Sequence, residues 1–114
     1  MRRRFRLTSP TEFKRVRRDG KSFAHPLIVL IVMPNMDQSL HIGVTAGRSL
    51  GGAVQRNRAK RVLRAALQPL LPELTPGWDV ILIARRPLLD AAWVDVQEAV
   101  RTTLQRARLV KDIL

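Results

Sequence analysis

The residues with the clearest chemical potential lie in one short block. Six side chains in it are cationic or carry an amide: Arg56, Asn57, Arg58, Lys60, Arg61 and Arg64. Arginine guanidinium groups bind phosphate oxygens through two parallel hydrogen bonds, and a helix brings such groups to one face about once per turn. The block therefore predicts a surface that binds a polyanion, nucleic acid above all.

A helix over residues 52–68 would have two distinct faces. At about 100° per residue, the basic side chains fall on one stripe and the apolar ones on the opposite stripe. The apolar stripe contains Ala59, Val62, Leu63 and Ala66. Solvated helices usually interleave Glu with Lys or Arg, whereas residues 46–72 contain no acid, which favours polyanion binding over a merely solvated face. Asn57 can read a base edge or bond locally, and both interpretations stay open.

The charge of the whole chain is concentrated in two segments. The 114 residues include 21 Lys and Arg and nine Asp and Glu, for a net charge of +12. Residues 1–21 carry +7 and residues 48–64 carry +6, and all the others together carry −1. Clustered charge of one sign repels itself unless a polyanion neutralises it. A basic surface kept for solubility is the plainer alternative, but solubility does not require clustering.

Nothing in the sequence supports catalysis by the protein itself. His25 and His41 have no partners at a metal-ligand spacing, and no Ser-His-Asp arrangement is apparent. Residues 47–52 are rich in glycine but lack the Gly-Lys-Ser/Thr ending of a phosphate loop, so a turn before a helix is the better interpretation. We expect no catalytic residue in the protein and no metal ion bound by it.

Length and composition predict one domain over residues 1–114, with residues 1–8 as a basic arm, and the charge predicts that this domain binds nucleic acid. No stretch approaches the roughly 20 apolar residues of a membrane span, so we expect no membrane contact. Arginines follow Met1, but the apolar core of a secretory signal does not. The chain has no cysteine, which is compatible with a reducing compartment, and we expect a cytoplasmic protein.

Local patterns predict the elements in the first half of the chain. Ser9 can cap a helix that ends before Gly20, which places a basic helix at Pro10–Asp19. Residues 22–33 are typical of an extended segment with a bend at His25-Pro26, and Leu40–Ala46 alternates as a second strand, antiparallel to the first. Phe13, on the basic helix, can stack on an unpaired base or pack in the core, and both interpretations stay open.

The second half predicts a central strand over residues 79–84 and a last helix that begins at Asp90. The core-facing side chains of that helix would be Trp93, Val96, Val100, Leu104 and Ala107. The order of elements is then α-β-β-α-β-α. The fold class is α+β, with helices packed against a small mixed sheet.

Several blocks together are typical of one family. The most specific is Arg56-Asn57-Arg58 with Lys60, Arg61 and Arg64. The others are Arg6-Leu7, Glu12-Phe13, Gly20 and residues 42–45, 53–61 and 79–85. On these blocks the chain resembles, nearly end to end, the protein subunit of bacterial ribonuclease P.

This resemblance implies a fold, an activity and partners. The fold would be similar to domain 2 of ribosomal protein S5, with a left-handed β-α-β crossover. The protein would assist an RNA subunit that removes the 5′ leader of precursor tRNA with Mg²⁺, and those ions would be bound mainly by the RNA. Its partners would be that RNA subunit and precursor tRNA, with one protein monomer per RNA.

The resemblance also assigns residues to the two RNA contacts. The RNA subunit would lie against Arg56, Asn57, Arg58, Lys60, Arg61 and Arg64. The leader would lie against Phe13, Arg17, Lys21, Ile31 and Arg48. Positions 17 and 31 are often aromatic in the family, so Arg17 would contribute charge or guanidinium stacking instead.

Two other functions are compatible with the charge pattern alone. A structural RNA-binding protein, of the ribosomal or RNA-chaperone type, would bind RNA with no role in cleavage. A DNA-compacting protein is less favoured, since nothing in the sequence suggests the dimer that such proteins usually require.

Overall fold

The computed structural model describes residues 6–7 and 9–110, and its first helix has the predicted bounds. Helix α1 (Pro10–Asp19) begins after Ser9, whose hydroxyl accepts a hydrogen bond from the Glu12 amide at 3.4 Å. The chain turns away at Gly20, where a Cβ would lie 2.5 Å from the Val16 carbonyl oxygen and 2.9 Å from that of Val32. Glycine is needed there because helix and sheet approach so closely.

Four strands form one mixed sheet in the order β1-β2-β4-β3. Their bounds are β1 (Lys21–Ala24), β2 (Ile28–Pro34), β3 (Leu40–Ala46) and β4 (Trp78–Ala84). Strand β2 pairs antiparallel with both β1 and β4, and β4 pairs parallel with β3. The central position predicted for β4 is confirmed, and so is the α+β class.

The sheet differs from the prediction in two respects. The extended segment over residues 22–33 is two strands, because the bend at His25-Pro26 closes a hairpin in which the His25 amide donates to the Ile28 carbonyl oxygen at 2.8 Å. Strand β3 does run antiparallel to β2, but it does not pair with it, since β4 lies between them. Strand order depends on contacts between distant segments, which local alternation does not report.

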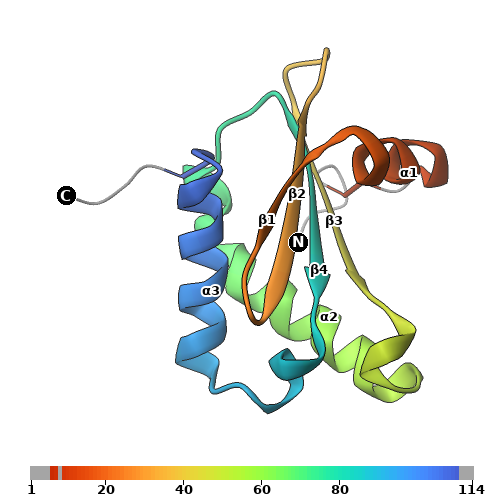
Figure 1. Cartoon of the computed structure of the whole chain (residues 1–114). Coiled ribbons are helices and arrows are strands. Elements are labelled where there is room, and N and C mark those ends of the chain that lie inside the picture. Colours follow the sequence, from red (N-terminus) through yellow and green to blue (C-terminus); the bar gives the residue numbers. More distant parts are fainter. Residues whose placement is uncertain (1–5, 8, 111–114) are drawn as a thin grey trace.

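The helices cover the two faces of the sheet unequally. Helices α2 (Ala53–Leu67) and α3 (Trp93–Arg106) lie on one side and α1 on the other (Figure 1). Strand β4 shows how the faces separate: Val80, Leu82 and Ala84 join the main core under α2 and α3, whereas Ile81 and Ile83 face α1. The sheet is thus buried on both faces, with the larger core on the side of α2 and α3.

Helix α2 has its predicted bounds within one residue, whereas the predicted start of α3 is wrong. Helix α2 passes directly into a 3-10 helix, Gln68–Glu73, which contains Pro69 and Pro72. Helix α3 begins at Trp93 with Ala92 as its N-cap, and Asp90 instead ends a separate 3-10 helix, Arg86–Asp90. Because the N-cap of α3 lies two residues later than predicted, Trp93 lies at the tip of the helix and is 47% exposed, not in the core. Val96, Val100 and Leu104 are buried as predicted.

Of the predicted basic arm, residues 1–5 and 8 lie outside the described part of the chain. The two residues that are described run beside β3: Arg6 forms a parallel bridge with Ile42, and the Leu7 amide donates to the Ile42 carbonyl oxygen at 2.8 Å. Within residues 6–7 and 9–110, no helix is long and apolar enough to cross a bilayer.

Candidate nucleic-acid interface

Helix α2 presents the two faces that its sequence predicts. Ala59, Leu63, Ala66 and Leu67 are buried in the main core. On the other side, Asn57, Arg58 and Arg61 are exposed, and Arg56, Lys60 and Arg64 are half-buried. Long basic side chains lay their apolar stems on the protein and keep their charged ends in water. The buried face fixes the orientation of α2, so the charged ends form an array of defined spacing.

The glycine-rich segment before α2 forms a turn that leads into the helix. Residues 48–50 form a short 3-10 helix, Gly51 has φ 121°, and Gly52 is the N-cap of α2. A φ of this sign favours glycine. This agrees with the prediction of a turn leading into a helix.

The basic side chains of α2 have no acidic partners in the described structure. None of the ion pairs formed within residues 6–7 and 9–110 involves them. The Nε atoms of Arg56 and Arg64 are buried without a hydrogen-bond partner. Asn57 likewise makes no side-chain hydrogen bond to another described residue, so local bonding does not account for it. Unpaired guanidinium groups spaced by one helical turn, about 5–6 Å apart, suit successive phosphates of a nucleic-acid strand.

A second surface lies on the opposite face of the sheet, beside α1. Val16, Ile31 and Ile81 form a small buried cluster, against which Phe13 packs in a half-buried position. A Cβ on Gly43 would lie 2.6 Å from Cε2 of Phe13, so the ring rests directly on the backbone of β3. Phe13 therefore packs partly in the core, as one interpretation of the sequence expected, and the accessible part of its ring leaves the stacking interpretation open.

The residues predicted to contact the leader are only partly brought together. Phe13 and Ile31 share the α1 face, and Arg17 projects from α1 into solvent. Arg48 is exposed just beyond the end of β3. Lys21 lies on the other face of the sheet, with its Nζ 5.3 Å from the centroid of the Phe23 ring. It lies there because side chains alternate along β1, and Lys21 and Phe23 are two residues apart.

Sequence reasoning missed other residues of the α1 face. Val29, Met33 and Ile83 are partly buried hydrophobic residues packed against its cluster. They lie in the apolar runs of residues 28–33 and 80–84, where both faces of the strand are apolar and alternation does not show which face a side chain is on. Together with Phe13 they make this face largely apolar.

Several cations of α1 are neutralised by acids. Arg15 pairs with Glu12 and, at 3.2 Å, with Asp79, and Arg18 pairs with Asp19 at 3.0 Å. The hydrogen bond from the Arg18 guanidinium holds the pKa of Asp19 below its ordinary value, and the same contact raises the pKa of Arg18. These pairs leave α1 with less free positive charge than α2.

Asp79 organises the end of the α1 face nearest the N-terminus of the helix. Its carboxylate is 2% exposed and accepts hydrogen bonds from Arg15 at 3.2 Å and from the Asn35 amide at 3.0 Å, and its Oδ1 lies 2.9 Å from Nδ1 of His41. Its oxygens are thus occupied by protein donors. Asp79 therefore has a structural role here.

The side chains that could ligate a metal ion are dispersed in the described part of the chain. In the described part of the chain, no group of three or more His, Cys, Asp or Glu side chains is placed to hold a metal ion. The carboxylate of Asp79, which could serve as one ligand, already faces a guanidinium group and an amide. We therefore derive no chemical step through a metal held by the protein.

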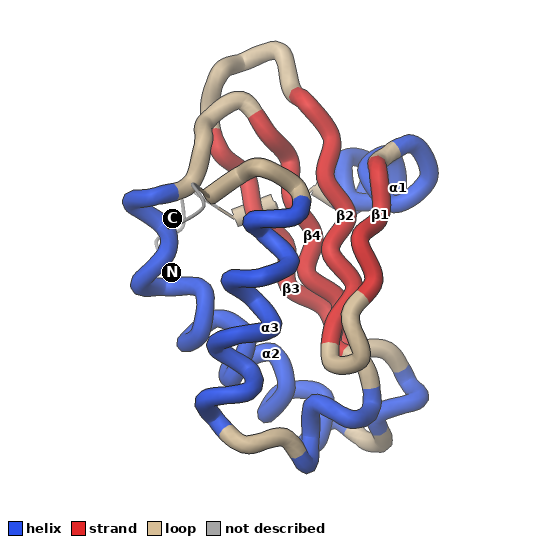
Figure 2. Tube along the Cα trace, turned by 60° about the vertical axis from the view of Figure 1, so that its left-hand side comes forward, coloured by secondary structure: helices blue, strands red, loops and turns tan. Residues whose placement is uncertain are grey.

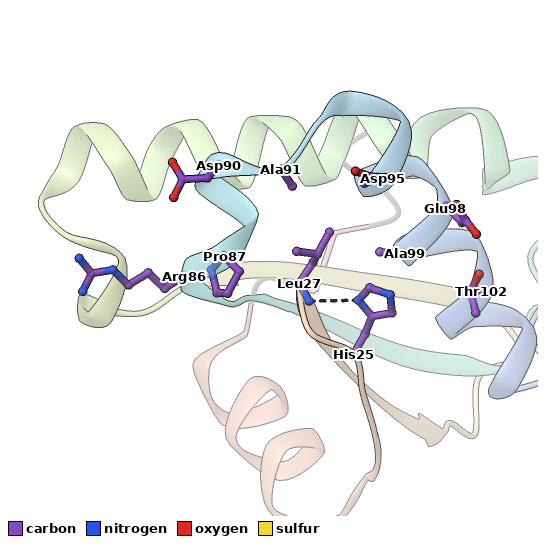
Figure 3. Close-up of a pocket in the computed structure, with 10 residues that line it drawn as sticks. All are labelled: His25, Leu27, Arg86, Pro87, Asp90, Ala91, Asp95, Glu98, Ala99 and Thr102. Carbon is purple, nitrogen blue, oxygen red and sulfur yellow. Dashed lines mark hydrogen bonds between the residues drawn. The ribbon is translucent and has the colours of Figure 1, made fainter.

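One cavity of about 790 Å³ is acidic and separate from both surfaces (Figure 3). It lies between the β1–β2 hairpin and the start of α3, and Asp90, Asp95 and Glu98 line it. In the same cavity Nδ1 of His25 accepts a hydrogen bond from the Leu27 amide at 3.0 Å. Three carboxylates disfavour phosphate, so this cavity is not part of a nucleic-acid interface.

Known proteins share the sequence and the fold. A family model described as Ribonuclease P matches residues 1–108. The ribonuclease P protein component of Herpetosiphon aurantiacus is 45% identical over 112 residues, covering 98% of this chain and 91% of that protein. The component of Chloroflexus aurantiacus is 41% identical over 111 residues, covering 96% of this chain and 82% of that protein.

Solved structures agree with these sequence matches. The structure of the Staphylococcus aureus RNase P protein has a TM-score of 0.84 at 26% identity, covering 94% of this chain and 98% of that chain. The RNase P protein from Thermotoga maritima has a TM-score of 0.78 at 25% identity, covering 89% and 96%.

Proposed function

We propose, from the premise that the chain belongs to the ribonuclease P protein family, that its two surfaces bind two different RNA strands. The family makes the chain a protein subunit of ribonuclease P. The basic face of α2 binds the RNA subunit, and the α1 face binds the 5′ leader of precursor tRNA. The observation that carries the proposal is the row of unpaired cations on α2, set on the opposite side of the sheet from an apolar face with an accessible aromatic ring.

The two surfaces suit two kinds of contact. Phosphates along a folded RNA attract unpaired guanidinium groups, and this attraction does not depend on sequence. Six residues of α2 make this contact in the proposal: Arg56, Asn57, Arg58, Lys60, Arg61 and Arg64. The leader is single-stranded, and its unstacked bases can lie on apolar and aromatic side chains such as Phe13 and Ile31, with Arg17 close to the phosphates.

Electrostatics explains why a protein helps an RNA enzyme. The leader and the RNA subunit are both polyanions and repel each other when they come together. At 0.1 M salt this repulsion is largely screened only beyond about 10 Å. A protein with cationic groups toward both strands reduces that repulsion. Mg²⁺ bound by the RNA subunit supplies the metal chemistry in this proposal, and no side chain of the protein is assigned a catalytic role.

The test is cleavage by the reconstituted complex. Adding the protein to a bacterial ribonuclease P RNA and precursor tRNA should accelerate release of the 5′ leader and lower the Mg²⁺ concentration needed for half-maximal rate. A structural RNA-binding protein would bind without accelerating cleavage, and coincident Mg²⁺ titrations would contradict the electrostatic role. The location in the cytoplasm and the 1:1 ratio of protein to RNA remain predictions of the same proposal.

A further inference from the structure

A groove of about 590 Å³ lies on the face of the sheet opposite α1, between β1 and the C-terminal end of α3. It contains three cations and two aromatic rings contributed by separate segments of the chain. Its principal lining residues are Asp19, Lys21, Phe23, Trp78, Arg106 and Arg108. The charge count by segment does not reveal this cluster, because Arg106 and Arg108 belong to a region whose acids balance its bases.

Two of the three cations of the groove, Lys21 and Arg106, contact neighbouring residues. Arg106 donates to the Ala24 carbonyl oxygen at 2.7 Å, and its Cζ lies 5.9 Å from the centroid of the Phe23 ring, which Lys21 approaches from 5.3 Å. None of the ion pairs within the described ranges includes Lys21, Arg106 or Arg108. Asp19 is the acid at the rim, and its carboxylate is taken by Arg18.

The backbone at Arg108 is an independent sign that its side chain is used. Arg108 has φ 62°, in the left-handed region where helices commonly end on glycine. Its amide donates to Gln105 at 2.9 Å, and the next residue, Leu109, donates to Leu104 at 3.0 Å and is buried. An arginine in this conformation costs free energy that a glycine would not. Strain of this kind at an exposed cation suggests a functional role for the side chain.

The groove is continuous with the α1 face around the edge of the sheet. Lys21 follows α1 directly after Gly20, and in the described sheet β1 is an edge strand. Figure 1 shows β1 with α3 on one side and α1 on the other, and Figure 2 shows β1 as the outermost strand, next to α1. Lys21 and Arg108 line the groove, and Arg17, exposed on α1, precedes Lys21 by four residues.

We propose that this groove binds the part of the leader farthest from the cleavage site, after the strand leaves the α1 face and crosses the edge at β1. The inference rests on the proposed function of the α1 face. Phosphates of the strand pair with Arg108 and Lys21, and a base stacks on the guanidinium plane of Arg106 or on Trp78. Short leaders end before the edge and do not reach the groove.

The experiment measures the affinity of the reconstituted holoenzyme for precursor tRNA with leaders of about 4 and about 16 nucleotides, the range of single-strand site sizes. Arg108→Gly should weaken binding of the long-leader precursor about tenfold, equivalent to about 1.4 kcal/mol, and leave the short-leader precursor unchanged. The same variant should raise the Tm by about 4 °C because glycine relieves the backbone. Arg108→Lys should keep most of the affinity.

Two controls separate the possible failures. Arg86→Ala removes one exposed cation in the acidic cavity and should change neither affinity. Phe13→Ala tests the α1 face and should weaken binding of both precursors.

If Phe13→Ala weakens binding of both precursors and Arg108→Gly weakens binding of neither, the groove assignment is wrong and the function of the α1 face stands. An equal loss for both leader lengths with Arg108→Gly would also overturn it, because the groove would then contact the RNA subunit or the tRNA body. If Phe13→Ala has no effect, the proposed function of the α1 face fails.

Discussion

The two surfaces that we propose as RNA-binding sites use positive charge in different ways. On α2 the cations stand over a buried apolar face and have no acid between residues 46 and 72. On α1 two of the four cations are paired with acids, and the surface beside them is apolar and includes Phe13. Both helices are basic, but the cations of α2 are unpaired, whereas some cations of α1 form ion pairs within the protein.

Because the two surfaces differ in unpaired charge, their binding should respond differently to salt. If about five phosphates lie against α2, the logarithm of affinity for the RNA subunit should fall against the logarithm of salt concentration with a slope of about −3.5 to −4.5. Binding through the α1 face depends more on stacking, which salt affects little. Four sets of substitutions test this difference between the α2 and α1 surfaces.

The largest effect is expected from removing the row of cations on α2. Replacing Arg56, Lys60 and Arg64 with Ala should weaken binding to the RNA subunit about 1,000-fold, at about 1.4 kcal/mol per lost contact. The salt slope should become shallower by about two to three units. Filter binding across a salt series measures both quantities. Arg85, Arg86 and Arg101 replaced together remove equal charge elsewhere and serve as the control, and an unchanged slope would move the RNA contact to another surface.

The next effect tests whether charge on the α1 side supports the fold. Asp79→Asn replaces a buried carboxylate that accepts from Arg15 and Asn35, and it leaves the guanidinium without its buried partner. Breaking such a pair should lower the free energy of unfolding by about 3 kcal/mol. Urea denaturation measures the loss, with exposed Asp95→Asn as the control. Affinity for the RNA subunit, measured where the variant is folded, should not change, and a parallel loss of that affinity would contradict the separation of the two surfaces.

A smaller effect should distinguish stacking from charge. Phe13→Ala should weaken binding of precursor tRNA with a leader about tenfold without altering the salt slope, because one stacked base contributes about 1–3 kcal/mol. Gly43→Ala should act in the same direction, since the new Cβ would displace the Phe13 ring. Binding of mature tRNA, which has no leader, is the control, and an equal loss there would show that Phe13 supports only the fold.

The smallest effect concerns pH. Hydrogen bonds from the Ser39 hydroxyl and amide hold the pKa of Asp37 below its ordinary value. A carboxyl whose pKa is lowered by folding stabilises the protein above its unfolded pKa, and this contribution disappears as pH falls through the folded pKa. The Tm of Asp37→Ala should therefore lie slightly below that of the parent at pH 7, and the difference should shrink as pH falls below the ordinary carboxyl pKa. Asp90→Ala is the control, and a difference that stays constant as pH falls would contradict the role of Asp37.

Local features of the fold could be predicted because their causes are local. The capping residues around Pro10 and Gly20 determine the bounds of α1, and the same spacing rules place the buried and basic faces of α2. The family resemblance adds the assignment of these faces to RNA. Features at the ends of elements were less predictable. Asp90 has the side chain of an N-cap, but Ala92 takes that position because a separate 3-10 helix precedes α3.

The positions of individual site residues depended on the strands. Lys21 was predicted beside Phe13, but the hairpin at His25 makes β1 a separate edge strand whose register turns Lys21 to the other face. The exposure of Trp93 followed from where α3 starts, which periodicity cannot define to within a turn.

The sequence by itself determined where the charge is, which face of α2 carries it, and that the chain belongs with RNA-binding proteins. Which cations have no acidic partner depends on the tertiary structure, because acids distant in sequence pair with some of them: Asp79 lies 64 residues from Arg15. It also brought Arg106 to β1, where it bonds a carbonyl oxygen 82 residues away. Helix and strand patterns depend on residues a few positions apart, whereas side chains distant in sequence can pair only after the sheet has formed.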